Sequence, residues 1–93
     1  RLTVTKTTKI EVDLSCPIKT AAGEVAVLSL TRPNVGHLRR AEKDARADGG
    51  GDVAYMTHLI KHCAELSMPE VDQIDSADLA GISETLSRFL PKD

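Results

Sequence analysis

The stretch KIEVDLSC at residues 9–16, followed by EVAVLSLT at residues 24–31, decides the fold. In the first run apolar side chains occupy the even positions and polar ones the odd positions, which predicts a strand with one face in water. Pro17 is expected to end that strand, and residues 21–23 are expected to connect it to the second run. The two runs together predict an antiparallel β-hairpin.

Two irregularities accompany this pattern. The alternation slips by one at residues 27–28, which a bulge or burial on both faces would explain. The alternation of the first run also extends back to Leu2 and Val4, and a strand over residues 2–16 would measure about 50 Å at ~3.3 Å per residue. A domain of this size is narrower than that. Residues 1–8 are therefore expected to be an arm that is loose or added to another molecule as an edge strand.

Two helices are expected next. The first runs from Val35 to about Ala47, with Pro33 or Asn34 as its start signal and a thin apolar stripe among charges. The glycines within residues 48–51 should end it and form a mobile loop. The second helix runs from about Asp52, a plausible N-cap, to Glu65. Its apolar face, which should lie in the core, contains Val53, Met56, Leu59, Ile60 and Cys63.

The remaining residues predict an irregular connection and a last helix. Residues 66–74 carry apolar side chains that should pack on the core, and a helix follows from Asp75 or Ser76 toward Pro91. Asp75 and Asp78 resemble a capping arrangement at its start. Strands followed by helices predict an α+β domain, with an N-terminal antiparallel hairpin packed against about three C-terminal helices.

Composition limits the classes of function. A chain of 93 residues is the size of one domain, so a single domain over residues 1–93 is expected. Tyr55 and Phe89 are its only aromatic residues, so the core should be aliphatic. With a net charge of -2, no long-range field favours nucleic acid or a membrane. No apolar run reaches the ~20 residues of a membrane span, and Cys16 and Cys63 are expected to be buried thiols, so we expect a cytoplasmic protein.

No catalytic or cofactor motif is present. The sequence contains no GxSxG or HExxH, and the glycines at 49–51 lack the lysine of a phosphate loop. His58, His62 and Cys63 are the one cluster of metal-ligand types, but structural zinc needs four ligands. We therefore interpret them as two surface histidines beside a core thiol, and expect neither a catalytic residue nor a bound metal or cofactor.

The basic side of the first helix leaves an alternative open. A small regulatory DNA-binding domain would use residues 35–47, where four basic side chains would contact phosphates. Acidic residues are interleaved with them, pairs such as Glu42 with Arg46 fit an exposed salt-bridged face, and no aromatic residues provide a stacking platform. These features favour binding of a protein, without nucleic acid or membrane as a partner.

Several short segments carry a family resemblance. They are Leu14-Ser-Cys-Pro17, Val27-Leu-Ser-Leu-Thr-Arg-Pro33, Val35-Gly-His-Leu38, Ala64-Glu-Leu66, Ile74-Asp75, Asp78-Leu79 and Phe89-Leu90. In order and spacing, over residues 9–90, they resemble the tail assembly chaperones of contractile-tailed phages, in the group typified by Mu-like phages. His37 departs from the pattern, since an acidic residue is expected there.

The resemblance implies a non-catalytic protein that binds the long, helical tape measure protein and keeps it soluble until tail tube subunits replace it. It also implies self-association. A small aliphatic domain would mask apolar helical stripes by packing a helix in a groove or by adding a strand to its sheet. The residues expected to contact the partner are Leu2, Val4, Leu38 and Tyr55.

Overall fold

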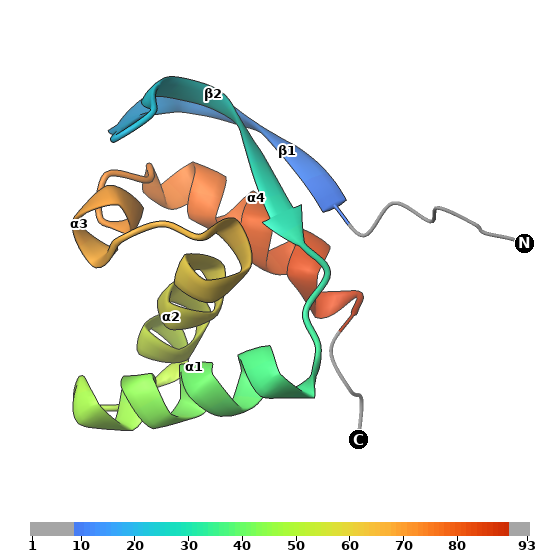
Figure 1. Ribbon diagram of the computed structural model, residues 1–93, viewed down its shortest axis with the longest axis vertical. Coiled ribbons are helices and arrows are strands. Elements are labelled where there is room, and N and C mark those ends of the chain that lie inside the picture. Colours follow the sequence, from blue (N-terminus) through green and yellow to red (C-terminus); the bar gives the residue numbers. More distant parts are fainter. Residues whose placement is uncertain (1–8, 90–93) are drawn as a thin grey trace, which may run out of the picture.

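A computed structural model describes residues 9–89, which form two strands followed by four helices (Figure 1). The elements are β1 (Lys9–Thr20), β2 (Gly23–Thr31), α1 (Val35–Ala47), α2 (Asp52–Ala64), α3 (Met68–Val71) and α4 (Ser76–Ser87). The strands pair antiparallel as one hairpin. The predicted α+β class, with an N-terminal hairpin and following helices, is confirmed. The predicted arm over residues 1–8 lies outside the described residues.

The prediction that Pro17 ends the first strand is wrong. β1 continues to Thr20, and its ladder with β2 is interrupted between Asp13 and Ile18, where residues 14–17 of β1 face Ala26 alone. Proline is tolerated in such a bulge because its missing N–H breaks no ladder bond. The same irregularity accounts for the slipped alternation of β2.

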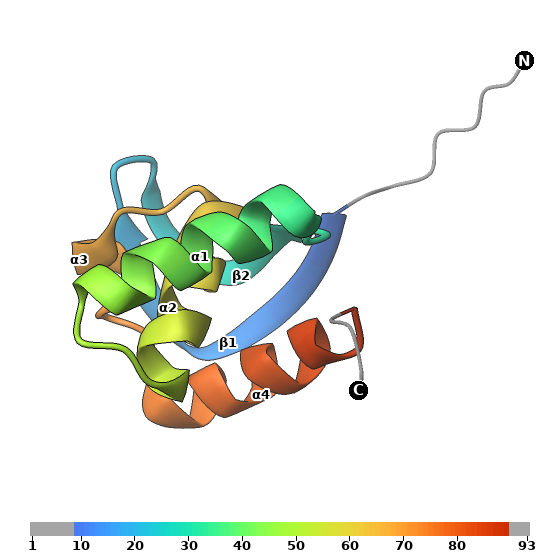
Figure 2. The same ribbon diagram turned by 90° about the horizontal axis from the view of Figure 1, so that it is seen from below.

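The hairpin arches over α2, α3 and α4, while α1 lies on the far side of α2 (Figure 1). Figure 2 shows α4 running alongside β1. Between these layers lies an aliphatic core, as predicted. Its buried members are Leu14, Ile18, Leu28, Leu30, Ala41, Leu59, Ile60, Cys63, Val71, Ile82 and Leu86.

Two apolar residues assigned to buried faces are exposed. Val53, in the first turn of α2, is 68% exposed. Cys16 is exposed because it lies in the bulge, where the alternation of β1 breaks down. The predicted packing of residues 66–74 is confirmed: Val71 is buried, and this segment contains the short helix α3. Phe89 follows the end of α4 and lies 5.0 Å from the guanidinium of Arg32, while Leu90 lies outside the described residues.

The loop between α1 and α2 has a defined hydrogen-bond pattern. The Gly50 N–H donates to the Ala45 carbonyl (2.7 Å) and the Gly49 N–H to the Arg46 carbonyl (3.3 Å), which is the Schellman arrangement at a helix C-terminus. Gly51 is then the N-cap of α2, so the prediction of Asp52 in that role is wrong by one residue. Asp52 instead places a negative charge in the first turn of α2, where it interacts favourably with the helix dipole.

Candidate partner-binding site

An open groove of about 510 Å³ lies between α1 and α2, beside the glycine loop. Its lining residues are Leu38, Arg39, Glu42, Ala45, Arg46, Gly50, Gly51, Asp52 and Tyr55. The structure therefore places Leu38 of α1 and Tyr55 of α2, both predicted to contact a partner, in one groove. Both side chains are half-buried and pack against the core. The other two predicted contacts, Leu2 and Val4, lie outside the described residues.

The rim of this groove is polar and of mixed charge. Arg46 forms an i, i+4 ion pair with Glu42 at 3.3 Å, the pairing that the sequence predicts, although both side chains are too exposed for it to add much stability. Burial raises the pKa of the Tyr55 hydroxyl, and the charge of Glu42 raises it further. Tyr55 thus brings an apolar ring and a neutral hydroxyl to the groove, and tyrosine is a residue type enriched at protein interfaces.

A second set of contacts joins α1 to α2. Asp44 accepts hydrogen bonds from His62 Nε2 (2.8 Å) and Lys61 Nζ (3.2 Å), which hold the pKa of its carboxyl below the usual value. Asp48 lies 3.2 Å from His58 Nε2. These contacts fix how the two helices that frame the groove lie against one another.

The interpretation of His58 and His62 as surface residues is wrong for His58, which is buried. Its Nδ1 has no hydrogen-bond partner among residues 9–89 and lies 3.9 Å from Asp44 Oδ2. The antiparallel pairing of α1 and α2 places His58 between Asp44 and Asp48. These contacts offset the free-energy cost of burying the polar imidazole ring. Cys63 is buried in the core, where desolvation raises the pKa of its thiol to about 11.

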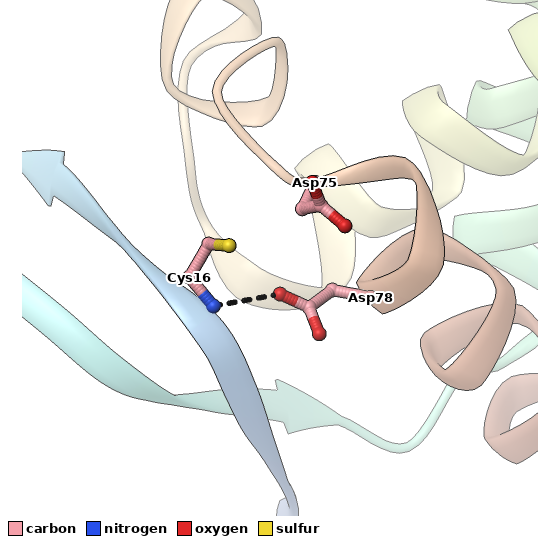
Figure 3. A group of neighbouring side chains, drawn as sticks. All are labelled: Cys16, Asp75 and Asp78. Carbon is pink, nitrogen blue, oxygen red and sulfur yellow. Dashed lines mark hydrogen bonds between the residues drawn. The ribbon is translucent and has the colours of Figure 1, made fainter.

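Side chains of metal-ligand type do converge elsewhere in the described part of the chain, at Cys16, Asp75 and Asp78 (Figure 3). Both carboxylates already accept hydrogen bonds from backbone N–H groups. Asp75 Oδ2 accepts from the Ala77 N–H as the N-cap of α4. Asp78, predicted to help cap that helix, instead reaches β1, where its carboxylate accepts from the Cys16 N–H at 3.1 Å. This group is therefore a structural clamp and carries no argument for a metal.

The clamp extends along the outer edge of β1. Asp78 also accepts from the N–H (3.0 Å) and hydroxyl (2.9 Å) of Ser15, and the backbone donors hold the pKa of its carboxyl below the usual value. Gln73 bonds both the N–H and the carbonyl of Lys19 at 2.8 Å. Glu70 accepts from the Ala21 N–H at 2.9 Å. Side chains from the C-terminal part thus bond the backbone of β1 at Ser15, Cys16 and Lys19 and the turn after it at Ala21.

Every helix within residues 9–89 is too short or too polar to cross a lipid bilayer.

The chain was compared with protein families, curated proteins and solved structures. No curated protein and no solved structure shows significant similarity to the chain. The model of a family described as "phage tail assembly chaperone proteins, E, or 41 or 14" matches residues 11–91. The match includes most of the hairpin and all the helices described above. Since it covers most of the sequence, the chain belongs to this family of phage tail assembly chaperone proteins.

Proposed function

We propose that this tail assembly chaperone binds an apolar helical segment of the tape measure protein in the groove between α1 and α2, and so keeps that protein soluble in the host cytoplasm. The observation that carries the proposal is the convergence of Leu38 and Tyr55 in one open groove. The role is binding rather than catalysis. Self-association, which the family resemblance implies, would use a different surface.

The groove suits one face of an amphipathic helix. Leu38, Ala45 and Tyr55 offer an apolar floor, and the charged side chains at the rim would face the polar flanks of the helix. A long helical partner exposes apolar side chains at i, i+3, i+4 and i+7, which aggregate unless they are covered. Covering such a stripe requires apolar contact rather than specific chemistry, and the apolar floor of the groove supplies that contact.

Co-purification tests the proposal. The chain would be co-expressed with a tagged helical fragment of the tape measure protein, as wild type and as Leu38→Glu and Tyr55→Glu. A charge placed on the apolar floor should reduce the recovered chaperone by about tenfold or more. Val53→Glu is the matched control, because Val53 is exposed on α2 outside the groove and its variant should bind like the wild type.

Folding of the variants needs a separate check because both groove residues also contact the core. Circular dichroism and thermal melting would show which variants remain folded, and Leu38→Ala is the milder substitute if Leu38→Glu unfolds. A folded groove variant that still recovers the fragment at the wild-type level would exclude this surface. Salt-sensitive retention of random duplex DNA would instead favour the alternative function on residues 35–47.

A further inference from the structure

The two outer edges of the β-hairpin differ in their hydrogen bonds to the rest of the described residues. Asp78 and Gln73 hydrogen-bond the outer edge of β1 between Ser15 and Lys19, and Glu70 bonds the turn that follows. No side chain or strand within residues 9–89 hydrogen-bonds to the backbone of the outer edge of β2 between residues 24 and 31. An uncovered edge presents backbone donors and acceptors in the spacing that another strand requires.

A second groove, of about 370 Å³, borders this uncovered edge. The groove is lined by apolar side chains from β2, from the end of α2 and from the segment that follows α2. They include Val25, Val27, Ala64 and Leu66. Val27 is 46% exposed, which is unusual for a valine on a strand beside a core. An added strand would therefore gain apolar contacts on one of its faces as well as backbone hydrogen bonds.

The charge of this groove restricts what binds there. Its charged lining residues are Glu65 and Glu70, with no lysine or arginine among them. Hydrogen bonds from backbone N–H groups lower the pKa of Glu70, so this carboxylate stays ionised at neutral pH. The preferred occupant is an extended segment with alternating apolar side chains and positive charge.

The chain contains such a segment in residues 1–8, RLTVTKTT. Leu2 and Val4 alternate with threonines, and the side-chain charges are those of Arg1 and Lys6, both positive. Threonine and valine favour extended backbone. The segment contains no Gly, Pro, Asn or Asp, so nothing in it signals the reversal needed to return to its own β2.

We propose that residues 1–8 of one copy add as a strand to the outer edge of β2 in a second copy, with Leu2 and Val4 in the groove beside Val27. Arg1 and Lys6 then lie near Glu65 and Glu70. Reciprocal exchange gives a closed dimer whose interface is separate from the groove between α1 and α2. Because the two surfaces are separate, the oligomeric state and the binding of the tape measure protein can be tested by different variants, and one can fail without the other.

Light scattering coupled to size exclusion, over a range of concentrations, tests the proposal on the full chain. The wild type should be a dimer. Two variants should dissociate about tenfold or more readily: Leu2→Asp/Val4→Asp, which alters the arm, and Val27→Lys, which places a cation where the basic arm binds. Val53→Lys is the control, because Val53 is also an exposed valine but does not line this groove, so the variant should leave the dimer intact.

Mixing the two variants shows whether they are monomeric because the contact between arm and edge is lost or because the variants are misfolded. The Val27→Lys copy keeps an intact arm and the Leu2→Asp/Val4→Asp copy keeps an intact edge, so the mixture should form a heterodimer although neither variant forms a homodimer. Amide exchange of residues 24–31 should slow in the heterodimer on the copy with the intact edge. A monomeric wild type, a dimer unaffected by either variant, or a mixture that stays monomeric would each overturn the proposal.

Discussion

At the scale of the residue, His37 makes the capping contact that an acidic or amide side chain commonly makes at the start of a helix. His37 Nδ1 accepts from the Asn34 N–H at 3.0 Å, and Asn34 Oδ1 accepts from the His37 N–H at 3.0 Å. This is a capping box in which imidazole takes the place of a carboxylate. Only the neutral ring offers a lone pair at Nδ1.

The box makes α1 sensitive to acid. Burial, followed by the charges of Arg40 and His62, lowers the pKa of His37 from its ordinary value of 6.5. The folded state therefore favours the neutral ring, and its stabilisation is complete above pH 6.5 and lost as pH falls through the folded pKa. NMR titration should show His37 protonating below pH 6.5. His37→Ala should lower the free energy of unfolding by ~1 kcal/mol or less at pH 7.5.

Glutamate is the matched substitution for this prediction. His37→Glu keeps an acceptor at the third helical position and adds negative charge beside the helix N-terminus. The difference in unfolding free energy between His37→Glu and wild type should grow in favour of the variant between pH 7.5 and pH 5.5. A difference that stays constant over this interval would show that the ring does not titrate with folding.

Sequence alone reached part of the candidate site at this scale. The sequence identifies Leu38 and Tyr55 as apolar side chains near the glycine loop, and they line one groove. The burial of His58 was missed because its partners lie on another helix. A signal was available: Asp44 and Asp48 repeat at i, i+4, as do His58 and His62, and an antiparallel helix hairpin pairs 44 with 62 and 48 with 58.

At the scale of the element, two glycines with opposite backbone requirements offer a matched test. Gly50 has φ +79° in the loop between α1 and α2, while Gly81 lies within α4, where an added Cβ would meet nothing within 4 Å. Gly50→Ala should destabilise the fold by about 1–2 kcal/mol through left-handed strain. Gly81→Ala should stabilise it by about 1 kcal/mol by improving helix propensity.

Urea unfolding of both variants measures these two effects. The midpoints should move in opposite directions with an unchanged slope, since neither substitution changes the surface exposed on unfolding. Equal destabilisation by the two alanines would mean that backbone conformation does not decide the outcome at these positions.

The elements themselves were largely predictable, and the errors have physical causes. The bounds of α1 follow from Asn34 before it and the glycines after it, both local signals. The end of β1 was misplaced because a strand continues through proline when a bulge removes the need for its N–H. Two N–H groups of that bulge donate to Asp78, a residue far away in the sequence, so no local signal marks the bulge.

At the scale of the whole molecule, the contacts of Asp78 join the hairpin to α4. Asp78→Asn removes the charge that three hydrogen bonds from Ser15 and Cys16 stabilise, and should lower the urea midpoint. Asp72→Asn is the matched control, because Asp72 is exposed and its side chain has no hydrogen bond within residues 9–89. A midpoint shift no larger than that of the control would show that the clamp does not stabilise the fold.

The hydrogen bonds of Asp78 also make the stability of the fold depend on pH in acid. The Ser15 and Cys16 N–H groups lower the pKa of Asp78 from its ordinary value of 3.8. Its stabilisation is therefore complete well above pH 3.8 and is lost as pH falls through the folded pKa. The difference in stability between wild type and Asp78→Asn, measured by urea unfolding, should shrink as the pH is lowered from 5 to 3. A difference that does not shrink would assign the effect to shape rather than charge.

The distance in sequence between the two sides of the clamp has a consequence for the order of folding. Ser15 and Asp78 are 63 positions apart, whereas α1 and α2 meet across a short loop. The entropic cost of closing the loop is larger for the distant pair. We therefore expect α1 and α2 to pack together in the rate-limiting step, and the contacts between β1 and α4 to form afterwards. In stopped-flow experiments Asp78→Asn should then unfold faster while refolding at nearly the wild-type rate. Slower refolding would place closure of this seam before the barrier.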